Sequence, residues 1–310
     1  MLIRETFATK IQHRIEPVVK VANRRPEVLY EELTNLVVTP QWEVHIRQVL
    51  DAFVNAATSD SEDGIGVWIS GFFGSGKSLE MKVLGMLLEG GVIHGQHVHD
   101  LFLARLPSTS KERELISHLL EVCRRKTLTT AFGGNVFFHT SSNDDTLALT
   151  AFKFFMATRN YAQHWPLAWS VEYYIDSAGL QDQFHNRASD LCGEDWDEIA
   201  ADAEFYINQL CAAASDVMPN QFPTAEAVMN SVRAADQAKI SPAALVSRLT
   251  RWCQEHDRDG KRQKVFIQLD EVGQWMSAGN INDRAMQVQA LAEGAATEGR
   301  GRVWIAVTAH

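Results

Sequence analysis

The segment 71–78 constrains this chain more than any other feature, because its residues G-F-F-G-S-G-K-S fit the pattern G-x-x-x-x-G-K-[ST] at every fixed position. An apolar run, 67–69, stands immediately before it, and 79–88 follows with helical spacing. In such a strand–loop–helix unit, glycines let successive backbone N–H groups point at a phosphate near the start of the helix. The segment therefore predicts a phosphate-binding loop in an α/β protein.

Two side chains of this loop have predicted roles of their own. We expect Lys77 to reach the β- and γ-phosphate oxygens of ATP and to act in catalysis, and Ser78 to ligate Mg²⁺. The residues expected to cradle the nucleotide are Gly71, Phe72, Phe73, Gly74, Ser75, Gly76, Lys77 and Ser78. ATP and Mg²⁺ are thus the cofactors that the sequence predicts.

Length and composition favour a folded chain. The sequence has 310 residues, of which 45% are apolar and 22% are charged, and this balance is typical of globular domains. The sequence shows no apolar run near the roughly 18 to 20 residues that span a bilayer, and its first residues lack the apolar core of a signal peptide. We therefore expect a cytoplasmic protein without membrane contact.

Charge and cysteine content argue against several kinds of site. The four cysteines stand far apart and form no C-x-x-C pair, which disfavours a zinc cluster and a disulfide framework. The formal net charge is −10, so a contact with nucleic acid has to use a local patch or other chains. The available basic runs are 124–126 and 261–262 with Lys264, although short runs of this kind usually mark solvated loops and helix ends.

The hydrophobic pattern divides the chain into four parts. We expect an N-terminal helical extension over 1–60, a first part of the α/β core over 61–143, a helical insertion over 144–258 and a second part of the core over 259–310. Strands are predicted at 67–69, 135–140, 265–269 and 303–308, and helices at 42–53, 79–88, 111–127, 196–217, 223–236, 242–257 and 283–297.

Two weaker features have mainly structural interpretations. Gly133 and Gly134 are expected to form a turn, in preference to a second phosphate loop. His94, His97 and His99 are expected to lie in a surface loop, with a metal site as the less favoured alternative.

A second chemical motif follows the predicted strand 265–269. That apolar run ends in Asp270 and Glu271, and α/β sheets place ligands at the carboxyl ends of their strands. We expect Asp270 to hold Mg²⁺, partly through water, and Glu271 to orient and deprotonate the attacking water. The adjacent glutamate favours hydrolysis of ATP to ADP and phosphate over the chemistry of small-molecule kinases and GTPases.

The strand predicted at 303–308 supplies a third element. In P-loop ATPases with a catalytic glutamate, an additional strand lies between the P-loop strand and the Asp-Glu strand and has a polar residue at its tip. We expect Thr308 to be that residue and to contact the γ-phosphate or the attacking water, with His310 as the second candidate. The alternative is an ordinary polar strand end.

Longer segments of the chain resemble the P-loop ATPase of BREX bacteriophage-exclusion systems, the BrxC/PglY family. The segments that carry the resemblance are 11–21, 31–39, 66–78, 269–274 and 303–309. The segment 66–78 is more specific than the nucleotide-binding pattern alone, whereas the middle third of the chain matches only loosely.

The resemblance implies an AAA+-like P-loop NTPase fold, a three-layer α/β sandwich of the additional-strand, catalytic-glutamate type. It also implies an ATPase module of a bacterial anti-phage defence complex. The partners it implies are other BREX components, including a DNA methyltransferase, together with indirect or patch-mediated DNA contact and homo-oligomerisation.

Several activities stay open at this point. The chain stops two residues after Thr308, ahead of a lid domain, a second sensor or an arginine finger, so we expect a fragment with weak hydrolysis. An alternative is a nucleotide-stabilised assembly scaffold with little turnover, in which the helical insertion is the docking surface. A P-loop phosphotransferase is the third interpretation, and the pair Asp270 and Glu271 disfavours it.

Overall fold

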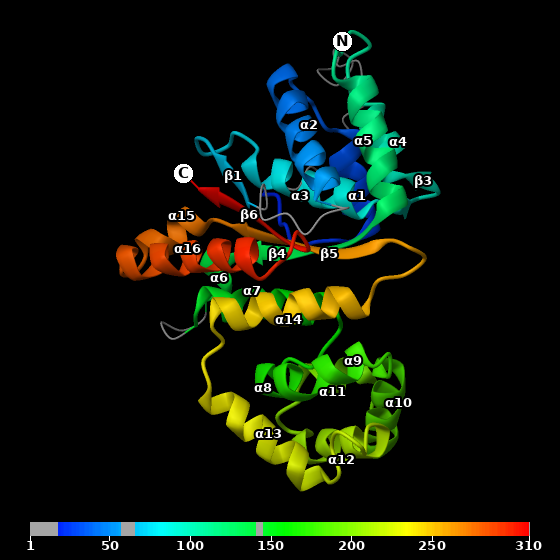
Figure 1. Cartoon of the computed structure of the whole chain (residues 1–310), viewed down its shortest axis with the longest axis vertical. Helices are drawn as coiled ribbons and strands as arrows, with labels where there is room; N and C mark the ends of the chain where they lie inside the picture. Colours follow the sequence, from blue (N-terminus) through cyan, green and yellow to red (C-terminus); the bar gives the residue numbers. More distant parts are fainter. Residues whose placement is uncertain (1–17, 57–65, 141–144, 310) are drawn as a thin grey trace, which may run out of the picture.

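A four-stranded parallel sheet forms the centre of the molecule (Figure 1). The computed structural model describes residues 18–56, 66–140 and 145–309. The strands are β1 (Gly66–Ser70), β4 (Thr127–Asn135), β5 (Arg262–Asp270) and β6 (Val303–Ala309), in the spatial order β1-β6-β5-β4. Every pairing among them is parallel, so their carboxyl ends share one edge and their amino ends the opposite edge. This parallel sheet confirms the predicted α/β fold class.

Helices cover both faces of the sheet (Figure 1). One face carries α2 (Pro40–Asn55), α3 (Lys77–Glu89) and α5 (Arg113–Lys126), with α1 (Pro26–Thr34) and α4 (Val98–Leu103) beside them. The other face carries α7 (Leu147–Thr158), α14 (Pro242–Glu255) and α16 (Ile281–Thr297). A short hairpin of β2 (Val92–Ile93) and β3 (Gln96–His97) precedes α4.

The central strands are buried on both faces, which explains why they are mostly apolar rather than alternating. Every residue of β6 is buried, as is every residue of β5 after Arg262. β5 also contains buried polar residues, Gln263, Lys264, Gln268 and Asp270. The side-chain amide of Gln268 donates to the backbone oxygen of Met81 on α3. A Cβ atom added to Gly85 of α3 would lie 2.6 Å from that amide nitrogen. The glycine therefore permits the close approach that holds α3 against β5.

The second strand that the chain contributes to the central sheet differs from its prediction. The structure has β4 at Thr127–Asn135, whereas 136–139 forms a short helix, α6 (Val136–His139), so the strand predicted at 135–140 is wrong. Gly133 and Gly134 lie inside β4 rather than in a turn. A Cβ atom on Gly133 would come within 1.9 Å of the backbone oxygen of Gln268, so this glycine serves the close contact between β4 and β5. Asn135 then ends the strand by capping α6, accepting from the Phe138 N–H.

The N-terminal helices pack against the same face as α3. Thr39 caps α2 by accepting from the backbone N–H of Trp42, and Pro40 occupies the first helical turn. Near the other end of α2, the ring of Phe53 lies 5.0 Å from that of Trp304 on β6. Burial of these aromatic side chains ties the N-terminal helices to the sheet.

The helices between α7 and α14 enclose a second hydrophobic core (Figure 1). Its buried residues fall between Ala162 and Val232, whereas α7 and α14 contribute to the core around the sheet. The predicted helix 196–217 is divided into two by 202–206. The elements in this lobe are α8 (Trp165–Leu167), η2 (Ala168–Glu172), α9 (Tyr173–Ser177), α10 (Gln181–Cys192), α11 (Trp196–Ala201), α12 (Ile207–Val217) and α13 (Ala225–Gln237).

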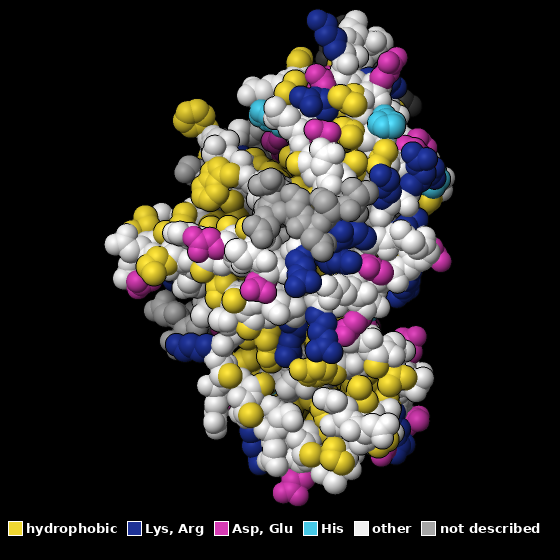
Figure 2. All heavy atoms as spheres, viewed as in Figure 1, with side chains coloured by type: hydrophobic (Ala, Val, Ile, Leu, Met, Phe, Trp, Pro, Cys, Tyr) yellow, Lys and Arg dark blue, Asp and Glu magenta, His cyan; other side chains and the backbone are white. Residues whose placement is uncertain are grey.

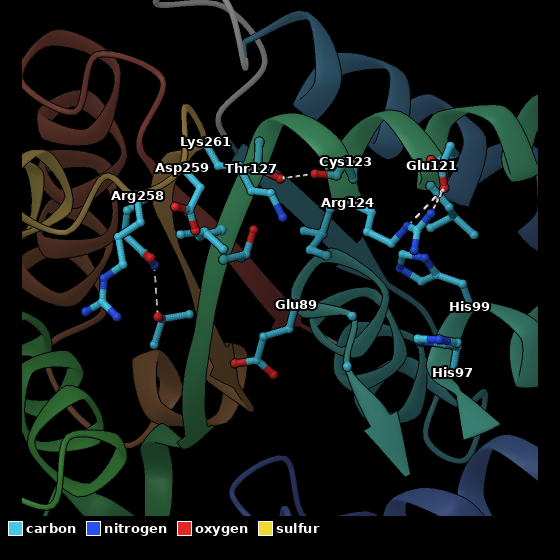
Figure 3. Close-up of a pocket in the computed structure, with 18 of the residues that line it drawn as sticks. Glu89, His97, His99, Glu121, Cys123, Arg124, Thr127, Arg258, Asp259 and Lys261 are labelled. Carbon is cyan, nitrogen blue, oxygen red and sulfur yellow. Dashed lines mark hydrogen bonds and ion pairs between the residues drawn. The ribbon is translucent and has the colours of Figure 1, made fainter. Parts of the chain in front are cut away.

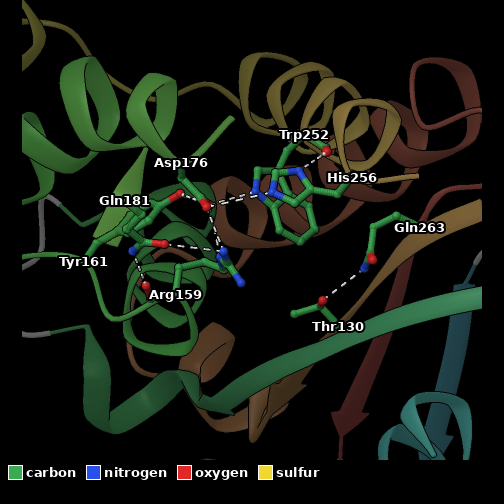
Figure 4. A network of polar contacts seen from close by, with 8 residues as sticks. All are labelled: Thr130, Arg159, Tyr161, Asp176, Gln181, Trp252, His256 and Gln263. Atoms are coloured by element: carbon green, nitrogen blue, oxygen red, sulfur yellow. Dashed lines mark hydrogen bonds and ion pairs between the residues drawn. The ribbon is translucent and has the colours of Figure 1, made fainter. Parts of the chain in front are cut away.

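A buried carboxylate joins this lobe to the helices on the sheet (Figure 4). Asp176 of α9 accepts from Arg159 at 2.7 Å, from the Tyr161 hydroxyl at 2.6 Å and from the Trp252 indole at 2.9 Å. Burial opposes ionisation of Asp176, but hydrogen bonds from His256 and Arg159 outweigh it and hold its pKa well below the ordinary range. The network thus connects the lobe to the end of α7 and to α14.

Hydropathy along the helices does not indicate a membrane span. Within the described ranges, none of the helices combines the length and the apolar character needed to cross a bilayer.

Candidate functional site

The loop between β1 and α3 lies at the carboxyl edge of the sheet. Gly74 and Gly76 have φ angles of +78° and +90°, in the left-handed region where a Cβ atom is unfavourable. Gly76 is the N-cap residue of α3, a helix of 13 residues that begins at Lys77. The first N–H groups of a helix lack intrahelical partners and carry partial positive charge. The local geometry therefore provides an anion-binding helix start beside a tightly curved loop.

Lys77 turns back over this loop. Its Nζ donates to the backbone oxygens of Gly71 at 2.9 Å and of Phe72 at 3.0 Å, and the residue is only 7% exposed. The ammonium group is therefore held at the loop, where a phosphate oxygen could compete for it.

The two phenylalanines of the loop have a different orientation. Phe72 is 91% exposed and Phe73 is 87% exposed, so their side chains do not line a phosphate site. At these two positions the loop can offer a ligand its backbone, but the aromatic rings face solvent. Their expected place in the nucleotide cradle therefore applies to main-chain groups alone.

Three segments that are far apart in the sequence meet at Asp270. The Ser78 hydroxyl donates to Asp270 Oδ1 at 2.9 Å, and the Thr308 hydroxyl donates to the same oxygen at 2.6 Å. Asp270 is 3% exposed and Thr308 is fully buried. The strand order makes this contact, because β6 lies between β1 and β5 and delivers Thr308 beside the end of β5.

Glu271 follows Asp270 in a sharply turned conformation. Its backbone N–H donates to Thr308 Oγ1 at 2.9 Å, and its φ and ψ of 58° and 34° place it in the left-handed region. Such a backbone costs a non-glycine residue about 1–2 kcal/mol. Strain of this kind often occurs at functional sites. The turn separates β5 from α15 (Val272–Ser277) and fixes where the Glu271 side chain begins.

The oxygens of Ser78 and Asp270 fit a magnesium ion. Mg²⁺ prefers octahedral oxygen ligands at about 2.0–2.1 Å, and two adjacent ligands then lie about 2.9 Å apart. The Ser78 Oγ to Asp270 Oδ1 distance is 2.9 Å. Among the described residues, no group of three or more His, Cys, Asp or Glu side chains could hold a metal ion. Mg²⁺ needs no such group, because phosphate oxygens and water usually complete its shell.

Other predicted candidates are placed elsewhere or remain undescribed. His310, the second candidate for the polar tip of β6, lies outside the described residues. His94 and His97 belong to the β2–β3 hairpin, so the predicted loop contains a short antiparallel pair. His99 lies on α4, where its Nε2 is 2.8 Å from the Leu87 backbone oxygen and burial lowers its pKa.

Sequence reasoning missed two residues that shape this edge. Asn135 ends β4 in register with Asp270, where its side chain turns the chain into α6. Gln268 sets the position of α3 from within β5. The available signal for the Asn135 cap was the residue type itself, because Asn is favoured at the position directly before a helix. The Gln268 contact had no local signal, because Met81 lies on a different element.

No protein-family model and no solved structure matches this chain. The residues of the site are therefore the basis for its function. They combine a helix start, a lysine at a glycine-rich loop, a hydroxyl and carboxylate spaced for Mg²⁺, and an adjacent glutamate.

Proposed function

We propose that this chain binds ATP with Mg²⁺ at the loop 71–78 and hydrolyses it to ADP and phosphate. The observation that carries the proposal is the shared contact at Asp270 Oδ1, which accepts from both Ser78 and Thr308. It joins the glycine-rich loop, the Asp-Glu strand and the strand between them into one site. This arrangement supports a P-loop NTPase fold of the additional-strand type.

Each residue has a role that its geometry supports. The loop backbone and the start of α3 bind the phosphates, and Lys77 contributes a positive charge at the loop. Ser78 and Asp270 hold Mg²⁺, which offsets negative charge on the phosphates when bound. Glu271 accepts a proton from the attacking water, and Thr308 positions Glu271 through its backbone N–H.

The cellular setting is a further part of the proposal. We propose that the chain acts in the cytoplasm as part of a BREX defence complex. The resemblance of the segments 66–78, 269–274 and 303–309 to the BrxC/PglY family supports this membership. Under this proposal, ATP turnover would be coupled to partner proteins, including a DNA methyltransferase.

A nucleotide-stabilised scaffold is the second candidate. The observation that favours it is the separate hydrophobic core between Ala162 and Val232, which gives the chain a lobe with its own packing. In a scaffold, ATP would support assembly through this lobe, and turnover would stay low. Phosphate release in the presence of partners separates this candidate from the ATPase.

The decisive experiment compares ATP binding and phosphate release in three variants. Lys77→Ala should abolish ATP–Mg²⁺ binding in calorimetric titration, whereas the exposed control Lys111→Ala should bind like the parent. Glu271→Gln should keep binding and lose phosphate release. Equal ATP affinity in Lys77→Ala and Lys111→Ala would refute the cradle, and unchanged turnover in Glu271→Gln would refute the assigned base.

A further inference from the structure

Basic residues precede three adjacent strands at the amino edge of the sheet, opposite the phosphate loop. The run 124–126 stands directly before β4, Lys261 directly precedes β5 and Arg262 begins it, and Arg300 stands three residues before β6. The register aligns them, because Thr127 pairs with Arg262 and the Arg262 guanidinium donates to the Arg300 backbone oxygen at 3.2 Å. Neighbouring strands lie about 4.8 Å apart, so the three groups lie side by side at this edge, and together we call them the basic row.

This basic row consists of seven side chains from four segments: Arg124, Arg125, Lys126, Arg258, Lys261, Arg262 and Arg300. Lys126, Arg258 and Arg300 are exposed, and Lys261 is half-buried. Figure 2 shows Lys and Arg side chains gathered at the level of the sheet and beside α5, although the whole chain has a net charge of −10. These basic residues are far apart in the sequence, and the fold brings them to one edge of the sheet.

Most carboxylates around the row already have cationic partners. Asp259 and Asp100 line the same cavity as Arg124, Arg258 and Lys261 and lower the local positive charge, but the seven cations outnumber them. Glu121 pairs with Arg124 and Arg125 of the row itself and so offsets one of its charges, whereas Asp257 pairs with Arg302 and Glu89 with Arg24, two cations outside the row. Positive charge therefore predominates along this edge.

A cavity of 880 Å³ opens beside the row (Figure 3). Arg124, Arg258 and Lys261 line it and reach it from different segments, with β4 between them. Thr129 of β4 also lines it, and its buried hydroxyl has no hydrogen-bond partner among the described residues. The recess thus presents cationic groups from both sides of β4, and Glu89, Asp100, Glu121 and Asp259 also line it.

We infer that the basic row binds the phosphate backbone of a nucleic-acid duplex. Duplexes present closely spaced phosphates that Lys and Arg neutralise, releasing counterions. Single-strand binders usually add exposed aromatic side chains for base stacking. Among the described residues, the large hydrophobic side chains that are exposed do not belong to the row. The row therefore suits contact with a backbone rather than with unstacked bases.

The inferred surface is separate from the proposed ATP site. ATP is assigned to the carboxyl edge, whereas the row lies at the amino edge of the same sheet. Both ligands can therefore be bound at once. Duplex binding by the row does not require ATP hydrolysis, so it can be measured without nucleotide.

The test measures fluorescence anisotropy of a labelled 25-base-pair duplex of mixed sequence between 50 and 200 mM NaCl. The row variant combines Lys126→Gln, Arg258→Gln and Arg300→Gln. The control combines Lys111→Gln, Arg233→Gln and Lys239→Gln, which removes the same charge from exposed positions elsewhere. Each phosphate contact contributes about 0.9 to the slope of log affinity against log salt concentration, so the three substitutions of the row variant should lower the magnitude of that slope by about 2.7. The affinity of the row variant at low salt should fall by about tenfold or more.

The control should bind the duplex with the slope of the parent. Equal slopes in the row variant and the control would overturn the inference, as would failure of the parent to bind at 50 mM NaCl. Tighter binding of a single-stranded oligonucleotide than of the duplex would overturn the choice of ligand. Urea unfolding of the row variant, followed by tryptophan fluorescence, should match the parent, which verifies folding without relying on the ATPase proposal.

Discussion

Replacing Thr308 by valine tests the centre of the proposed site with little change in volume. The Thr308 hydroxyl donates to Asp270 at 2.6 Å and accepts from the Glu271 N–H at 2.9 Å, and the residue is fully buried. The substitution removes the hydrogen bond to the Asp270 carboxylate, which contributes about 1.5–3 kcal/mol to stability. It also leaves the Glu271 N–H without an acceptor, which costs about 1–3 kcal/mol. Because Glu271 is half-buried and water can reach part of it, we expect a loss of roughly 2–4 kcal/mol in unfolding free energy.

Urea unfolding followed by tryptophan fluorescence measures this loss. ATP turnover should fall by about 10- to 100-fold, because Glu271 is no longer held in place and small displacements of catalytic groups have effects of this size. Thr308→Ser keeps the hydroxyl and should lose only about 1 kcal/mol with turnover largely retained.

A matched control exists on α14. The Thr250 hydroxyl is also buried and donates to the Val246 backbone oxygen at 2.8 Å, away from the site. Thr250→Val should lose about 1 kcal/mol and leave turnover unchanged. The reasoning is refuted if Thr308→Val matches Thr308→Ser in both unfolding free energy and turnover.

Three further predictions concern buried ionisable groups. Burial raises the pKa of Glu172 from 4.5 to about 8, so stability should fall as pH rises from about 4.5 to 8, and urea unfolding of Glu172→Gln should lose this dependence. Burial lowers the pKa of Lys264 from 10.5 to about 7, so its contribution to stability should rise with pH between about 7 and 10.5. Lys264→Met should stabilise the protein by about 1–2 kcal/mol at pH 7 and remove that rise, and an unchanged midpoint would contradict it. Asp176→Asn should cost about 3–5 kcal/mol at pH 7, because it leaves Arg159 without its buried partner. The pKa of Asp176 lies below its ordinary range, so the stability it contributes should be lost as acid is added in a pH titration of the parent but not of the variant.

Local patterns were sufficient for the elements that carry the proposed chemistry. The run 67–69 and the glycines after it predict a strand, a loop and a helix, and the structure has β1 and α3 on either side of Gly71 and Gly76. The strand before Asp270 and the strand before Thr308 are likewise present as β5 and β6. These segments are predictable because short apolar runs and glycine positions act on their own backbone.

Local patterns failed where a distant segment decides the conformation. The sequence predicts a turn at Gly133. The residue lies in a strand instead, and the backbone of Gln268 on β5 approaches it closely. The same pairing places Asn135 at the end of β4, beside Asp270. The residues near 127–140 in the sequence do not include those of β5, so the local pattern could not give the correct bounds of β4.

The sequence by itself determined which chemical groups this chain offers: a glycine-rich loop with Lys77 and Ser78, the pair Asp270 and Glu271, and separate basic runs. Only the tertiary structure decided that Ser78 and Thr308 share one oxygen of Asp270, and that the basic runs form one row at the opposite edge. The physical reason is that local backbone preferences act over a few residues. The order and register of parallel strands instead depend on pairing between segments far apart in the chain.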